Sequence, residues 1–148
     1  MSPQIIFFDT KSNWYAKALE LRYKILREPL GLEFTEEELM KDEADVHVCA
    51  QMGDKVVACL TLTNGGDNTL KIRQVAVDTE HQSKGFGKLL NDAAEEYAVK
   101  NGYVELNCHA RKTAVPFYQK QGYRVVGDEF TEVTIPHCKM KKSLYEQK

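Results

Sequence analysis

Residues 82–88, "QSKGFGK", have the composition and spacing of a loop that binds a phosphate-bearing ligand. Two glycines follow a glutamine in the pattern Q-x-x-G-x-G, and an apolar helical pattern comes next. Glycines let the backbone approach a ligand closely, and the N–H groups that open a helix carry the positive end of its dipole. The alternative is that the glycines only shape a tight loop and the lysines are solvated. The residues concerned are Gln82, Ser83, Lys84, Gly85, Phe86, Gly87 and Lys88.

Two common phosphate-binding motifs are excluded at this loop by residue identity. A dinucleotide fingerprint, G-x-G-x-x-G, needs a third glycine where Leu90 stands. A P-loop needs a glycine in place of Gln82 and a serine or threonine in place of Leu89. The loop alone therefore indicates an anion site and leaves its ligand open.

Histidine and cysteine also occur close together in "HVC" (47–49), "CH" (108–109) and "HC" (137–138). None of these has the spacing of a zinc knuckle, and neighbouring residues of a strand point to opposite faces. We therefore expect no metal site.

The elements that must position the loop follow from periodicity and capping signals. Strands are expected at 5–9, 46–51, 55–63, 69–77, 103–110 and in two segments between 123 and 142. Ser12 caps a first helix, and Thr35 with Glu38 forms a capping box for a short second one. A third helix follows the loop and stops at Asn101-Gly102, and a fourth spans about 113–121.

This order predicts an α+β fold whose sheet is mixed and mostly antiparallel, with one central parallel strand pair flanked by helices. The 148 residues are expected to form a single domain, 1–148. A net charge of −2 disfavours nucleic acid as a partner. No apolar run is long enough to span a bilayer, and the four scattered cysteines suit a reducing compartment, so we expect a cytoplasmic protein.

Two segments together resemble the GNAT superfamily of N-acetyltransferases. "VAVDTEHQSKGFGKLL" resembles its acetyl-coenzyme A motif, a strand and loop followed by Q/R-x-x-G-x-G/A at a helix start. "ARKTAVPFYQKQGY" resembles its A-x-x-F-Y-x-x-x-G-F/Y segment. The subgroup it looks most like has "LR" in the first helix, here Leu21-Arg22, and "IPH-x-x-M" in the last strand, here residues 135–140.

The resemblance implies the GNAT acyl-CoA N-acyltransferase fold and transfer of acetyl from acetyl-CoA to a primary amine by direct attack. It places the cofactor pyrophosphate on residues 82–88 and the pantetheine arm along the backbone of Val75, Ala76 and Val77, where strand addition uses main-chain groups. Tyr118 is implied as the general acid that protonates the coenzyme A thiolate. Core burial is the alternative role for Val75, Val77 and Tyr118.

The general base stays open in the sequence. His109 shares a strand face with Glu105 and Asn107, and His137 lies in the expected last strand beyond Glu132. These two histidines rank first as bases for an incoming amine, although a structural role is the alternative for each. Arg111 stands where many family members have asparagine, and its role is open as well.

The acceptor is the largest gap. The acidic stretch "TEEELMKDEAD", residues 35–45, hints at a cationic amine, but such a run is commonly a solvated face. A small molecule, a peptide N-terminus and a lysine side chain all remain open, as does a homodimer. The competing functions are a non-catalytic coenzyme A-binding or sensing module of the same fold and a nucleotide-phosphate binder of another fold.

Overall fold

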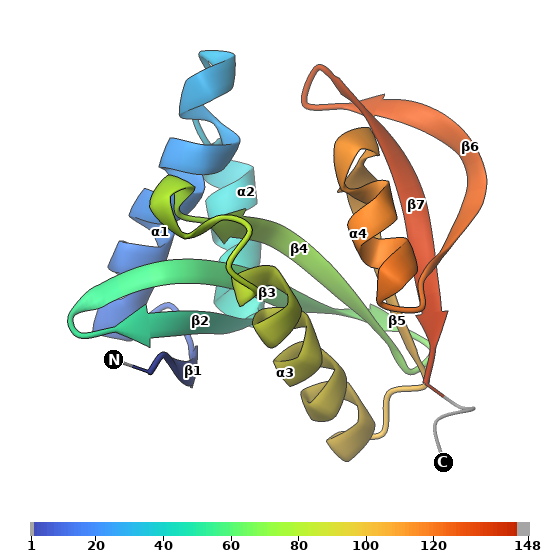
Figure 1. Cartoon of the computed structure of the whole chain (residues 1–148), viewed down its shortest axis with the longest axis horizontal. Helices are drawn as coiled ribbons and strands as arrows, with labels where there is room; N and C mark the ends of the chain where they lie inside the picture. The colour runs from blue at the N-terminus through green and yellow to red at the C-terminus, as the bar shows by residue number, and fades with distance from the viewer. Residues whose placement is uncertain (1, 145–148) are drawn as a thin grey trace. The chain divides into compact units, whose positions relative to one another are not determined.

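The computed structural model describes residues 2–144, and Figure 1 follows the chain from β1 in blue to β7 in red. The predicted domain of 1–148 thus has its first residue and its last four outside the described residues. The strands are β1 Gln4–Phe8, β2 Val46–Met52, β3 Lys55–Gly66, β4 Thr69–Val77, β5 Glu105–Arg111, β6 Arg124–Glu132 and β7 Ile135–Ser143. The helices are α1 Asn13–Leu26, α2 Glu36–Lys41, α3 Phe86–Lys100 and α4 Val115–Lys120, with short 3₁₀ turns η1 Glu28–Leu30, η2 Asp42–Ala44, η3 Thr79–His81 and η4 Lys112–Ala114.

Hydrogen bonding orders the seven strands β1-β2-β3-β4-β5-β7-β6. β4 and β5 pair in parallel, whereas β1–β2, β2–β3, β5–β7 and β6–β7 are antiparallel. A parallel pair needs a crossover connection, and α3 supplies it. The predicted mixed sheet with one parallel pair is therefore confirmed.

The chain divides into two compact units. Within the described residues, the first unit comprises 2–63 and 73–94, and the second comprises 64–72 and 95–144. β3, β4 and α3 each begin in one unit and end in the other.

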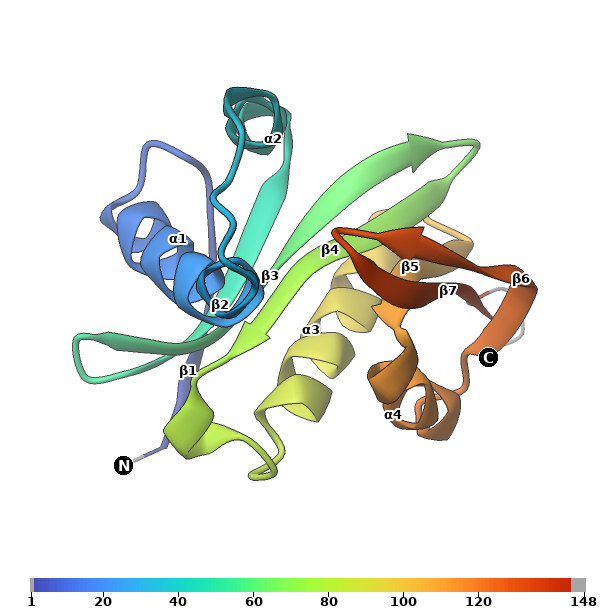
Figure 2. The same ribbon diagram turned by 90° about the horizontal axis from the view of Figure 1, so that it is seen from above.

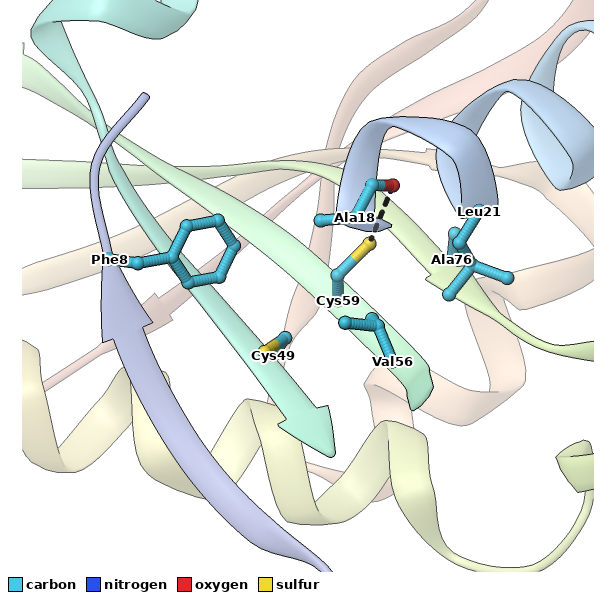
Figure 3. Close-up of a cluster of buried hydrophobic side chains, with 7 residues drawn as sticks. All are labelled: Phe8, Ala18, Leu21, Cys49, Val56, Cys59 and Ala76. Carbon is cyan, nitrogen blue, oxygen red and sulfur yellow. Dashed lines mark hydrogen bonds between the residues drawn. The ribbon is translucent and has the colours of Figure 1, made fainter. Parts of the chain in front are cut away.

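The first unit has a core between α1 and the strands β1 to β4. Figure 3 shows its buried side chains: Phe8, Ala18, Leu21, Cys49, Val56, Cys59 and Ala76. The predicted caps are present, since Ser12 Oγ accepts from the Trp14 N–H at 3.1 Å, and Thr35 and Glu38 exchange both bonds of a capping box. These bonds satisfy N–H groups that a helix start leaves without an internal partner, which fixes where α1 and α2 begin.

The second unit consists of the tip of the β3–β4 hairpin, the end of α3, and the elements from β5 to β7; Figure 2 views α4 and the β6–β7 hairpin from above. β5 alternates as predicted, with Leu106, Cys108 and Ala110 buried and the residues between them half-buried. The predicted helix at 113–121 is shorter than expected, because a 3₁₀ turn takes up residues 112–114 before α4 begins beside Pro116.

Candidate active site

The end of β4 has a backbone that is paired on one side only. β4 pairs with β5 from Thr69 to Ile72, and within residues 2–144 no residue of β5 pairs with 75–77. Gln74 separates the two stretches with a φ of 56°, which a non-glycine residue adopts at a cost and which redirects the strand. Ala76 is buried, and Val75 and Val77 are half-buried, so their side chains pack while their main-chain groups have no partner in β5.

The loop that follows β4 has the features of an anion cradle. Ser83 and Gly85 both adopt the left-handed conformation, with φ of 64° and 87°. A Cβ at Gly85 would meet no atom within 4 Å, so the glycine is needed for its backbone angle rather than for space. The first intrahelical bond of α3 runs from the Leu89 N–H to the Gly85 carbonyl at 3.0 Å, which leaves the N–H groups of 86–88 without an acceptor in the helix.

Most polar side chains of this loop are exposed. Gln82, Ser83, Lys84 and Lys88 face solvent, and Lys88 also pairs with Asp92 at 2.8 Å. The Gln82 amide donates to the Val77 carbonyl at 3.1 Å, which joins the loop to the strand end. The structure therefore brings together, within the first unit, the residues that the sequence predicted as cofactor-binding.

Asp78 anchors this loop, and sequence reasoning missed it. Its N–H donates to the Val57 carbonyl at 2.8 Å, and its buried carboxylate lies 3.0 Å from His81 Nδ1, 3.1 Å from Lys55 and 3.7 Å from Lys24. Burial alone would raise the pKa of Asp78, but the hydrogen bonds from His81 and Lys55 and the lysine charges outweigh it and lower that pKa. Only the position of the residue, directly after a strand, signalled it in the sequence.

Tyr118 lies in the second unit and is buried, at 6% exposure. Its ring packs edge-on against Phe117 and Tyr123, with centroids 5.1 and 5.2 Å away. Burial raises the pKa of Tyr118 far above its usual value, and the Cys108 thiol adds to the shift. The phenol therefore stays protonated throughout the physiological pH range.

The two histidines predicted as base candidates meet one carboxylate in the second unit. His109 Nδ1 lies 2.9 Å from one oxygen of Glu132, and His137 Nε2 lies 3.8 Å from the other. Phe130 packs between the rings, stacked on His137 at 6.0 Å and edge-on to His109 at 4.9 Å. Arg111, whose role the sequence left open, ends β5 directly opposite His137.

His109 also lines a polar groove of about 310 Å³ in the second unit. The groove runs over β4, β5 and β7 and is bounded by the tip of the β3–β4 hairpin. The residues that line it are Gly65, Gly66, Asp67, Thr69, Lys71, Glu105, Asn107, His109, Lys139 and Lys141.

The acidic segment, residues 35–45, is not a solvated face throughout. Asp42 is fully buried, 2.8 Å from Arg22, and accepts from the Tyr15 hydroxyl at 2.6 Å. Asp45 pairs with Arg73 at 2.6 Å. His47 is fixed nearby by Thr61 and by the Asp42 carbonyl, both at 2.9 Å, so that histidine is structural.

A comparison with protein families gives a clear match. Residues 22–144 match the family described as "Acetyltransferase (GNAT) domain". The chain belongs to the GNAT acetyltransferase family. The resemblance to the GNAT superfamily and the predicted fold are thereby confirmed, and the subgroup stays a prediction.

Individual relatives and structures agree with this assignment. The GNAT chain is 38% identical over 73 residues to an uncharacterized N-acetyltransferase, YjcF, of Bacillus subtilis (strain 168), covering 49% of this chain and 52% of that protein. It spans about half the length of the first curated relatives it matches. A crystal structure of a candidate N-acetyltransferase from Lactobacillus plantarum has a TM-score of 0.87 at 26% identity, covering 97% of this chain and 99% of that one.

A GNAT family acetyltransferase from Elizabethkingia anophelis, solved with acetyl-CoA bound, has a TM-score of 0.74 at 16% identity, covering 97% of this chain and 99% of that one. Among residues 2–144, no group of three or more His, Cys, Asp or Glu side chains is arranged to hold a metal ion. No helix in that range has the length and apolar character needed to cross a membrane.

Proposed function

We propose that this GNAT protein transfers the acetyl group of acetyl-CoA to a primary amine by direct attack. The observation that carries the proposal lies in the first unit, where a strand end without a β5 partner beyond Gln74 leads through left-handed Ser83 and Gly85 to the start of α3. An extended arm can pair with the backbone of Val75, Ala76 and Val77, and the helix start can hold a pyrophosphate. The E. anophelis relative, which binds acetyl-CoA, supports the choice of ligand.

Attack by the amine nitrogen on the thioester carbon forms a tetrahedral intermediate, and the carbon–sulfur bond then breaks. N–H groups of the β4 end stabilise the oxyanion. Tyr118 donates its proton to the departing sulfur, and a histidine, His109 or His137, takes the proton that the amine loses. Desolvation raises the pKa of phenol and thiol alike, so burial of the departing sulfur beside Tyr118 offsets the barrier that the raised phenol pKa would otherwise add to the transfer.

Both units act as one N-acetyltransferase domain in this proposal, because the family match spans residues of each. The acceptor is a primary amine.

Release of the coenzyme A thiol from acetyl-CoA, measured over a panel of amines, tests the reaction. Tyr118→Phe should lower kcat by about 100-fold or more while coenzyme A still raises the melting temperature, since a general acid acts in the chemical step. A wild-type protein that coenzyme A stabilises but that releases no thiol with any amine would instead be a binding module.

The cradle itself is tested by Gly85→Ala. Any side chain is strained at a φ of 87°, so this variant should weaken coenzyme A binding. Gly31→Ala is the matched control, because Gly31 has a φ of 69° with the same open surroundings but lies beside η1. Equal binding by both variants would remove the loop from the cofactor site.

A further inference from the structure

Hydrogen bonding fixes which nitrogen of His109 is free. A carboxylate only accepts, so the 2.9 Å contact with Glu132 requires that Nδ1 carries the proton and donates it. Lys71 Nζ also lies 3.5 Å from Nδ1, but this distance is too long for a strong hydrogen bond. The lone pair of neutral His109 is therefore on Nε2, which is the arrangement of a histidine oriented as a base by a carboxylate.

His137 has a different arrangement around its ring. Its Nδ1 lies 2.9 Å from the Ile135 carbonyl and must donate to it, so its lone pair is also on Nε2. That Nε2 lies 3.8 Å from the second oxygen of Glu132, and His137 itself is only 5% exposed. A proton on His137 is thus directed to Glu132 rather than to an incoming amine, and His137 helps to hold that carboxylate.

The charges beside His109 favour a particular kind of acceptor. Lys71 lies on β4 next to the ring, and Lys139 is the residue directly opposite His109 on β7. Lys139 is exposed and makes no ion pair among residues 2–144, and Glu105 of the same groove instead lies 3.7 Å from Lys141 and accepts from the Asn107 amide at 3.3 Å. The exposed cation opposite His109 disfavours an ammonium ion beside it, favours the neutral amine that can attack, and attracts an anionic group.

We propose that the groove lined by His109 is the acceptor site, that Glu132 orients His109 as the base, and that the acceptor is a small amine that also carries an anionic group such as a carboxylate. The inference rests on the proposed transfer of acetyl from acetyl-CoA. His109 is the catalytic residue, and Glu132 and His137 are positioning residues.

The proposed acetyl transfer conserves protons and electrons. The neutral amine forms the nitrogen–carbon bond, and Nε2 of His109 takes one proton from that nitrogen. The intermediate collapses, the carbon–sulfur bond breaks with its electrons on sulfur, and Tyr118 protonates the thiolate. The products are the N-acetyl compound and coenzyme A thiol, and His109 returns its proton to water while Tyr118 is reprotonated.

Long-range proton–nitrogen NMR of the histidine rings tests the dyad without any need for activity. Neutral His109 should show the Nδ1–H tautomer in the wild type and a mixture of tautomers in Glu132→Ala. Glu132→Gln should keep the Nδ1–H form, because its amide oxygen still accepts. An Nε2–H tautomer of His109 in the wild type would overturn the assignment.

Chemical rescue tests the base in the working protein. His109→Gly should lower kcat by about 100-fold or more, and added imidazole should restore part of the loss, which a merely structural histidine would not permit. Glu132→Ala should lower kcat by about 100-fold through misplacement of the base, with Glu132→Gln between it and the wild type. Rescue of His137→Gly but not of His109→Gly would reverse the roles.

The acceptor class is tested with thiol release from α-amino acids, neutral monoamines and polyamines. Amino acids should give the highest kcat/KM, and Lys139→Gln should raise their KM about two- to fivefold without affecting neutral amines. Lys100→Gln, an exposed lysine at the end of α3, is the control and should change neither. Preference for polyamines would overturn the acceptor class, whereas a wild type inactive with every amine would refute the transferase itself.

Discussion

The acidic segment of the first unit and the groove of the second unit are both rich in charge, yet their charges do different things. In the acidic segment, the carboxylates of Asp42 and Asp45 are turned inward onto arginines, and Asp42 has no exposed surface. In the groove, Lys139 is exposed, and Lys71 and Lys141 are half-buried around a volume that a small molecule can fill.

The difference shows that the sign of a charge run does not by itself identify a binding surface. The acidic segment hinted at a cationic acceptor, but its two buried aspartates already have cationic partners within the protein, and Glu38 is paired with Arg27 at 2.6 Å. The groove has a weaker pattern in the sequence, since its lysines are spread over β4 and β7. Lys139 is nevertheless a charge that solvent and a ligand can reach.

Removal of one partner from the buried cluster should have the largest effect. Asp42→Asn leaves Arg22 without its counter-ion at 1% exposure, and breaking such a pair costs about 3–5 kcal/mol in the free energy of unfolding. Denaturant unfolding measures the loss. Glu36→Gln, an exposed carboxylate of the same segment, should change stability by less than about 0.5 kcal/mol. Similar small losses in both variants would mean that the segment is a solvated face after all.

Tyr15→Phe removes one hydrogen bond from the same cluster and should have an intermediate effect. The Tyr15 hydroxyl donates to Asp42 at 2.6 Å, and a bond to a charged group is worth about 1.5–3 kcal/mol. Burial, together with the hydrogen bond to Asp42 and the charge of Asp42, raises the pKa of Tyr15 from 10.0 to about 12 against the opposing effect of Arg22.

This shift gives the Tyr15 prediction a pH dependence. The folded state keeps its proton to higher pH than the unfolded state, so the contribution of Tyr15 is complete below the unfolded value and is lost as pH rises from 10.0 to about 12. The stability of Tyr15→Phe should therefore fall less steeply than that of the wild type in this interval. Parallel declines measured by denaturant unfolding at several pH values would contradict the raised pKa of Tyr15.

Much of the fold could be predicted from the sequence because its signals are local. The alternation in β5, the Ser12 cap and the Thr35–Glu38 capping box each involve residues a few positions apart, and the structure has all three. The loop at 82–88 was predicted as a cofactor site by motif, and its left-handed Ser83 and Gly85 explain in physical terms why the motif has this form.

The partners of the polar residues could not be predicted, since they depend on register and on distant segments. Asp42 meets Arg22 and Tyr15, which lie 20 and 27 positions away. Glu132 of β6 contacts His109 of β5 across 23 positions of the chain, and the pairing of β6 with β7 shifts register between Val126 and Phe130. A sequence pattern showed that His109 shares a face with Asn107, but such a pattern contains no information about that shift.

Ionic strength should affect the groove but not the buried cluster at Asp42, and this effect should be smaller than those of the substitutions above. Exposed charges are screened strongly as ionic strength rises from about 0.05 M to about 0.5 M, whereas buried pairs are screened much less. The KM for an amino acid acceptor should therefore rise about threefold over this range, which corresponds to the loss of a weak exposed interaction. The stability difference between the wild type and Asp42→Asn should stay constant over the same range. A salt-dependent difference would place solvent at Asp42.

Neutralisation of a lysine in the groove should have the smallest effect on stability. Lys139 is exposed and makes no ion pair within residues 2–144, so Lys139→Gln should change the free energy of unfolding by less than about 0.5 kcal/mol. Denaturant unfolding of this variant beside Asp42→Asn would compare the two regions directly. A loss of several kcal/mol for Lys139→Gln would show that the groove, like the acidic segment, uses its charge to hold the fold, and its role in acceptor binding would then lose its support.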